Sequence, residues 1–395
     1  MNPAAALADR LETVRAAARG WRQAGVIDET SLAAVDTLYP DDRHRVGPVF
    51  RVLLFVFALI SINGATGFFA MVLGHEALDV LPWLLLVFGL GLVVATEVLI
   101  IAPRRVLSGV EAATSLAGLG YLIGFVAWLS YEKIKMPDDR AMAATLLAAA
   151  VLLALAAWRW GYPLYAGLAM AALLGCLSFL PFGRLLWIVV PLAAALPLAR
   201  LADSARLPPA HRAACAFALA TGLAGLYVAV HYGSFDFGLI ESFRKGWGAA
   251  PSSPYGGLRW LSIAATALVP AIYLAVGLRT RRWVFLILGI GTTAASLITL
   301  RWYVHLAPLW VVLTAAGAVL VAAVFALRRY LDSGPGQERH GFTAEPLFDD
   351  IGRRQILEAG AAVLTLSPDA RPVHEEPKYT GGGGSFGGGG ASSEF

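Results

Sequence analysis

The sequence predicts an all-α, polytopic integral membrane protein with about ten transmembrane helices. Hydrophobic residues make up 58% of the 395 residues, whereas soluble domains contain roughly 45–50%. The mean hydropathy is +0.66, and only 15% of the residues are charged. The net charge of +4 comes from arginines in short loops between apolar runs. This pattern predicts that the partner of the chain is the lipid bilayer and not nucleic acid.

Residues 1–45 predict a small cytoplasmic hairpin of two helices. The apolar residues of its first helix recur at helical spacing, namely Leu7, Leu11, Val14, Ala18 and Trp21. Gly25 is expected to end this helix in a left-handed conformation, and Asp28 to cap a second helix that ends at Tyr39. A second interpretation is a helix that lies on the membrane surface, with its arginines against anionic headgroups.

In this amino-terminal region, Trp21 precedes a turn at residues 24–28, and a Tyr-Pro-Asp-Asp-Arg run at 39–43 leads into residues 47–53. With these features the region resembles a family of predicted bacterial membrane proteins known as domain of unknown function 2157. The resemblance covers residues 1–70 and the polytopic layout after them, and Val26 stands where leucine is commoner. It implies a membrane protein and supplies no activity or catalytic residue.

The transmembrane bundle is expected over residues 46–330. Ten apolar runs approach the ~20 residues that a membrane-spanning helix needs. They are 49–72, 80–101, 109–131, 141–157, 162–180, 185–201, 210–230, 258–277, 283–303 and 308–327. The fourth and the sixth runs are the shortest of these.

Arginine and lysine residues predict the orientation of the bundle. Alternate loops carry 13 basic residues on one side and 8 on the other. By the positive-inside rule the richer side is cytoplasmic. Arg104, Arg105, Arg281 and Arg282 are expected to anchor this topology. Ten spans then place both termini in the cytoplasm of a bacterium, with the chain in the inner membrane.

Two carboxylates inside apolar runs are candidate functional groups. Glu97 and Glu111 flank the Arg104-Arg105 turn, and a charge at bilayer depth is costly enough to suggest a role. One interpretation is a structural salt bridge to those arginines, which both glutamates can reach because they lie shallow in the membrane. The other is a proton or cation site.

A second candidate site lies near the middle of the first span. Residues 61–67 contain Asn63 and Thr66 beside Gly64 and Gly67. Such a segment can unwind and bind a substrate at the membrane midplane, as in many transporters. It can equally serve as an ordinary packing surface between helices.

The longest outer loop, 231–257, is the third region of interest. A short helix is expected near 237–243. His231, Asp236 and Glu241 offer acid–base or metal-binding groups there. The sequence contains no HExxH, GxxxxGK[ST], GxSxG or CxxC motif, so no cofactor, metal ligand set or catalytic residue is assigned.

Residues 331–395 are expected to form a largely disordered cytoplasmic tail. Its last fifteen residues, 381–395, are rich in glycine. This segment resembles natural tails of other bacterial membrane proteins, including some with a TPM-type domain, and it also resembles an engineered linker. The tail and the amino-terminal hairpin are the parts open to protein partners.

Three classes of function follow from these observations. The first is a transporter or channel for an ion or small molecule, suggested by Asn63 and Glu97. The second is a non-catalytic scaffold or accessory protein of the cell envelope. The third is a membrane enzyme that uses the outer loop 231–257. The sequence names no substrate.

Overall fold

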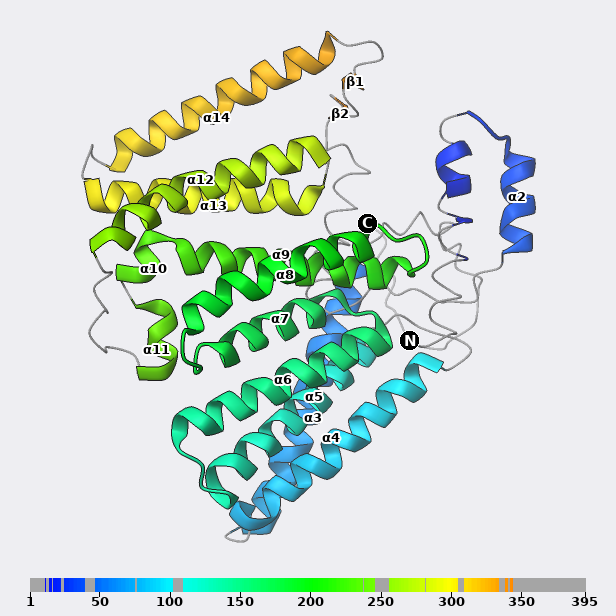
Figure 1. The fold of residues 1–395 in the computed structure, drawn as a ribbon. Helices are drawn as coiled ribbons and strands as arrows, with labels where there is room; N and C mark the ends of the chain where they lie inside the picture. Colours follow the sequence, from blue (N-terminus) through cyan, green and yellow to red (C-terminus); the bar gives the residue numbers. More distant parts are fainter. Residues whose placement is uncertain are drawn as a thin grey trace, which may run out of the picture.

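The computed structural model is a bundle of helices that run side by side (Figure 1). It describes residues 11, 14–15, 17–22, 25–39, 47–74, 77–101, 109–236, 238–245, 256–280, 282–304, 309–333, 338–339 and 342–343. Arg104, Arg105 and Arg281 lie outside these residues, as does the chain after residue 343.

A helix occupies the position of each of the ten predicted spans. These helices are α3 (Pro48–Leu73), α4 (Ala77–Ile101), α5 (Val110–Trp128), α6 (Asp138–Trp160), α7 (Pro163–Leu177), α8 (Gly183–Ala202), α9 (Pro209–Val230), α12 (Gly256–Thr280), α13 (Trp283–Val304) and α14 (Leu309–Asp332). A π-helical segment, η2 (Leu129–Lys133), extends α5, and two short helices, α10 (Tyr232–Asp236) and α11 (Leu239–Lys245), follow α9.

Seven helices in the described part of the chain are long and apolar enough to cross a membrane. They contain the spans Val49–Leu73, Val80–Ile100, Val110–Lys133, Asp138–Trp160, Gly183–Ala202, Pro209–Val230 and Arg259–Thr280. Length and composition thus confirm the membrane-protein class.

The fourth and sixth runs, the shortest of the ten, lie in helices that are long enough to span a membrane. The corresponding helices, α6 and α8, have 23 and 20 residues. The apolar runs are shorter than these helices because each helix continues into polar residues. Asp138 and Asp139 form the first turn of α6, where carboxylates interact favourably with the helix dipole. The short helix is instead α7, with 15 residues, or about 22 Å.

The amino-terminal hairpin has the predicted turn chemistry. Gly25 has a φ of +71°, and hydrogen bonds from Gly25 N to Arg22 O (3.1 Å) and from Val26 N to Trp21 O (2.8 Å) form a Schellman motif. Asp28 caps α2 (Glu29–Leu38) by accepting a hydrogen bond from Ser31 N at 2.9 Å. The cap and the left-handed glycine are therefore confirmed.

Glycine residues allow neighbouring helices to approach closely. A Cβ atom on Gly118 of α5 would lie 3.1 Å from Gly89 O of α4. A Cβ atom on Gly277 of α12 would lie 2.9 Å from Leu286 N of α13. By contrast, nothing lies within 4 Å of a Cβ on Gly120 of α5, and a Cβ on Gly124 would make only an ordinary contact with Leu85 Cδ1 at 3.7 Å.

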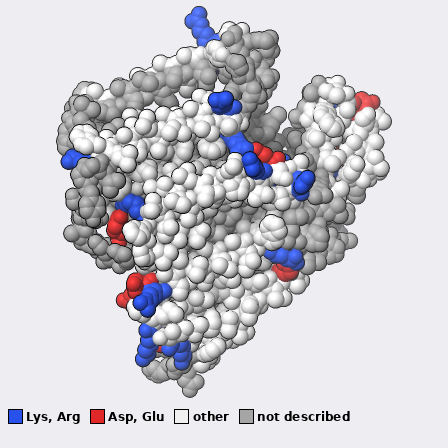
Figure 2. Space-filling model, in the orientation of Figure 1, with Lys and Arg blue, Asp and Glu red and all other residues white. Residues whose placement is uncertain are grey.

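Charged side chains gather at the ends of the helices. Figure 2 shows them along two opposite margins of the bundle, with a broad uncharged surface between. This is the distribution that a bilayer-spanning bundle requires, since the lipid core does not solvate charge.

After α14, a two-residue antiparallel pair forms where a disordered tail was expected. Strand β1 (Glu338–Arg339) pairs with β2 (Phe342–Thr343). Such a pair is too small to change the helical class of the fold.

Candidate functional site

The first predicted site, around Asn63, is an unbroken helix. α3 runs from Pro48 to Leu73 without interruption. Asn63 donates to Leu59 O at 2.8 Å, and Thr66 donates to Ile62 O at 3.0 Å, so both side chains bond to their own helix. The Thr66 and Tyr121 hydroxyls lie 2.8 Å apart, which joins α3 to α5. The segment is therefore not unwound in this structure, and of its two interpretations the packing surface between helices agrees with a backbone that keeps its hydrogen bonds.

The second predicted site, Glu97, is a link between α4 and α6. Its carboxylate forms an ion pair with Arg159 and accepts a hydrogen bond from Trp160 Nε1 at 2.8 Å. The structural salt bridge was expected, but the partner identified here is Arg159 of another helix. Glu111 is 6% exposed and accepts a hydrogen bond from Gly109 N at 3.2 Å, at the start of α5.

The structure does not bring these candidates into one site. Asn63 and Thr66 contact α5, whereas Glu97 contacts the end of α6. Arg282, a predicted topology anchor, forms an ion pair with Asp203 between α8 and α9. Each group therefore joins a different pair of elements.

A buried polar seam between α9, α12 and α13 was not found from the sequence. The Tyr227 hydroxyl lies 2.7 Å from Ser296 Oγ, which donates to Thr266 O at 2.6 Å. Thr266 Oγ1 in turn accepts a hydrogen bond from Tyr232 N at 2.8 Å. The signal for this seam is the spacing of Thr292, Ser296 and Thr299 at helical intervals on one face of α13.

At the end of the bundle where α8 begins and α9 ends, Arg184 holds the α10–α11 segment. Its guanidinium donates to both carboxylate oxygens of Glu241, at 2.9 and 2.7 Å. It also donates to Ala229 O at 3.0 Å and Ser234 O at 3.1 Å, and it lies over the Phe235 ring at 3.7 Å. We call this arrangement the Arg184 clamp.

His231 connects the end of α9 to α13. Its Nε2 lies 2.9 Å from Thr299 Oγ1, and burial lowers the pKa of the imidazole below its ordinary 6.5. The helix expected near 237–243 is present as α11. However, Glu241 is engaged by Arg184 and His231 by Thr299, so neither contributes a free acid–base group in this arrangement. The side chain of Asp236 lies outside the described residues.

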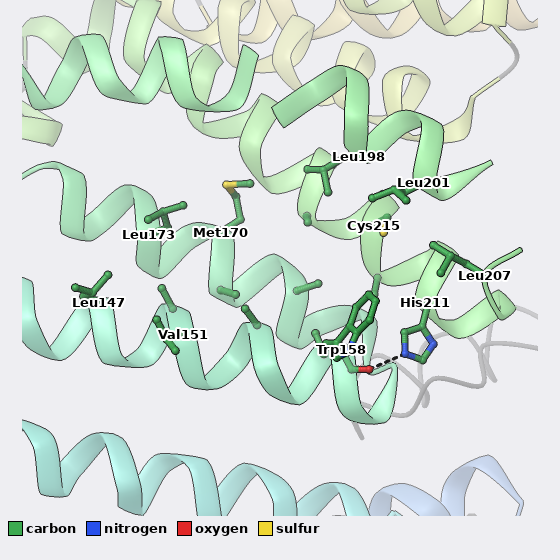
Figure 3. Close-up of a pocket in the computed structure, with 17 residues that line it drawn as sticks. Leu147, Val151, Trp158, Met170, Leu173, Leu198, Leu201, Leu207, His211 and Cys215 are labelled. Atoms are coloured by element: carbon green, nitrogen blue, oxygen red, sulfur yellow. Dashed lines mark hydrogen bonds between the residues drawn. The ribbon is translucent and has the colours of Figure 1, made fainter. Parts of the chain in front are cut away.

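An apolar groove lies between α6, α7, α8 and α9 (Figure 3). It has a volume of about 470 Å³. Seventeen residues line it, and nearly all are alanine, leucine, valine or methionine. Cys215 lies on its wall, whereas Cys176 does not.

One end of the groove carries its few polar atoms. His211, which is 7% exposed, places Nε2 2.9 Å from the carbonyl oxygen of Trp158. The rings of these two residues meet edge to face. Figure 3 shows both at one end of the groove, with Leu147 toward the other. The groove therefore runs from the carboxyl-terminal end of α6, at Trp158, toward Leu147 in the apolar middle of the bundle.

Among the described residues, no group of three or more His, Cys, Asp or Glu side chains is arranged to hold a metal ion. In comparisons with known proteins, no family model, no curated protein and no solved structure matches the chain.

Proposed function

We propose that the chain is a ten-span protein of the bacterial inner membrane with both termini in the cytoplasm. Contacts between helix ends support the alternation that ten spans require. The ends of α4 and α6 meet through Glu97 and Arg159. The loops after α8 and α12 meet through Asp203 and Arg282. All four belong to the arginine-rich side that the positive-inside rule assigns to the cytoplasm.

Within this topology we propose a scaffold or accessory role in the cell envelope. The observation that carries this proposal is that the polar groups suggested for transport are engaged in contacts between or within helices. Thr66 meets Tyr121, and Glu97 meets Arg159 and Trp160. Hydrogen bonds between helices are how membrane bundles gain specificity of packing.

The amino-terminal hairpin is the surface we propose for protein partners. Trp21, Val26 and Leu38 are exposed on it. Two of the arginines that would attract anionic lipid headgroups are paired instead, since Arg15 binds Asp36 at 2.8 Å and Arg22 binds Glu29 at 2.9 Å. The resemblance of residues 1–70 to domain of unknown function 2157 is compatible with this role and adds no activity to it.

Transport is the competing function, and a measurement of ion flux distinguishes it from the scaffold role. The purified chain is reconstituted in liposomes that contain a pH-sensitive dye, and proton, sodium and potassium gradients are applied. A scaffold gives no flux above protein-free liposomes. A flux that Glu97→Gln abolishes, while the variant retains its helical spectrum, would overturn the scaffold proposal in favour of an ion pathway through Glu97.

A further inference from the structure

The apolar groove between α6 and α9 has a geometry that fits a hydrocarbon chain. We propose that it binds one acyl chain of an anionic phospholipid from the leaflet on the arginine-rich side. Its walls offer methyl and methylene groups almost throughout. A cavity of this kind is not filled by water, which needs polar partners, and it readily takes apolar ligands.

The length of the groove matches a single leaflet. On α6 its lining runs from Leu147 to Trp158, a distance of about 16 Å at the helical rise. The hydrocarbon core of a bilayer is ~30 Å thick, so one leaflet supplies about half of that. One acyl chain that enters beside Trp158 therefore ends near Leu147, close to the midplane.

The groove is open to the lipid. Lining side chains at its margin are exposed, with Leu147 and Val151 at 50% and Trp158 at 61%. Trp158 lies at the end of α6, where an amphipathic indole is favoured at the level of the headgroups. A lipid can therefore enter from the side of the bundle without unfolding any helix.

Charge at the same end indicates the headgroup. The loop from α8 to α9 carries Arg206, which directly precedes the lining residue Leu207. Arg200 and Arg212 lie on the flanking helices at this end, and none of the three forms an ion pair with a described residue. The acidic groups described here, Glu97 and Asp203, are already paired with arginines. An anionic headgroup would complement this excess of positive charge.

Photo-crosslinking tests the site in the full chain. The chain is placed in phosphatidylcholine nanodiscs with a trace of phosphatidylglycerol that carries a diazirine in one acyl chain. After irradiation, labelled residues are mapped by mass spectrometry. We expect labels on groove residues such as Met170, Leu173 and Cys215, and we expect excess unlabelled phosphatidylglycerol to reduce them about tenfold. Labels on the rest of the lipid-facing surface should decrease only in proportion to the dilution of the diazirine probe by unlabelled lipid.

Two matched variants separate the groove from the rest of the surface. Ala154→Trp fills the groove from its exposed wall, whereas Ala271→Trp adds the same bulk to an exposed site on α12. Only the first should remove groove labelling. The proposed lipid site is wrong if Ala154→Trp leaves the labelling of the groove unchanged. It is also wrong if excess unlabelled phosphatidylglycerol does not reduce the labelling of the groove in the wild-type chain.

The headgroup is tested separately. A phosphatidylcholine probe with the same diazirine chain should label the groove several-fold less than the phosphatidylglycerol probe. Arg206→Ala should reduce that difference, whereas Arg259→Ala, at the opposite end of the bundle, should not. Equal labelling by the two probes would overturn the preference for an anionic lipid.

Discussion

Single residues in this protein act mainly as connectors between helices. Thr66 meets Tyr121, Ser115 meets Tyr165 at 2.6 Å, and Tyr227 meets Ser296. Each pair joins two different helices. In lipid, where apolar side chains give no net preference for one helix over another, such bonds contribute selectively to packing. Their loss should therefore change stability before it changes any chemistry.

Glu97→Gln is expected to lower the free energy of unfolding by about 1 kcal/mol. The amide can still accept the hydrogen bond from Trp160 but loses the charge attraction to Arg159. Chemical unfolding in mixed micelles measures this. Asp203→Asn is the matched control, because the Asp203 carboxylate that pairs with Arg282 is 59% exposed, against 24% for Glu97. If Asp203→Asn lowers the free energy of unfolding as much as Glu97→Gln or more, this expectation is wrong.

His231 is expected to make the end of the bundle near α10 sensitive to acid. Burial lowers its pKa in the folded state below the ordinary 6.5. Between these two values the unfolded state binds more protons, so stability falls as the pH drops below about 6.5 and is recovered above it. The midpoint of thermal unfolding should thus decrease more on acidification in the wild type than in His231→Gln. Parallel pH profiles for the two proteins would rule this out.

At the scale of elements, close contact between helices depends on particular glycines. Gly118→Ala is expected to destabilise the protein by about 1–3 kcal/mol, because the new Cβ meets the backbone of α4, which cannot move locally. Gly120→Ala, two residues away on the same helix, has nothing within 4 Å and should be neutral or slightly stabilising. Thermal unfolding of the two variants compares them. A loss of stability that is the same at both positions would assign the effect to helix propensity.

The Arg184 clamp determines whether the α10–α11 segment stays docked. Arg184→Ala removes two charge-assisted hydrogen bonds to Glu241 and two to backbone carbonyls. Local opening should become easier by about 2 kcal/mol. Amide hydrogen exchange in residues 232–245 should therefore accelerate at least tenfold. Arg259→Ala removes only a distant contact with the Tyr232 ring, at 5.8 Å, and should change exchange little. Unchanged exchange in Arg184→Ala would show that other contacts hold the segment.

For the whole molecule, the order of helices was predictable and their partners were not. Hydropathy located a helix at each predicted position because every membrane-spanning segment must be apolar along its length. The contact between Arg184 and Glu241 joins residues 57 positions apart, and no local pattern encodes it. The shortness of α7 was also hidden, because its apolar run continues through Phe179 and Leu180 into a turn where Phe182 has a φ of +61°.

The site was predicted less well than the fold. Residue type alone marked Asn63 and Glu97 as unusual, but it did not show that neighbouring helices satisfy them. The groove could not be predicted from the sequence because alanine and leucine at helical spacing are typical of any membrane helix. Its hollow exists only after four helices are assembled.

The proposed topology has a direct test at this scale. In intact cells, a membrane-impermeant maleimide should label Lys133→Cys after α5 but not Ala205→Cys between α8 and α9. Both variants are made in a chain without Cys176 and Cys215. Both positions are exposed in the structure. Labelling of position 205 alone would invert the orientation.

The short length of α7 affects the thickness of the bilayer around it. Its 15 residues span about 22 Å, which falls several ångströms short of the hydrocarbon core. The shortfall lies at its carboxyl-terminal end, since Pro163 follows α6 after a tight connection. Mismatch of this kind costs fractions of a kcal/mol per ångström and deforms the nearby bilayer. In the proposed ten-span topology, lipids with shorter tails relieve that deformation, so the bilayer beside α7 should be thinner than the bilayer beside its longer neighbours.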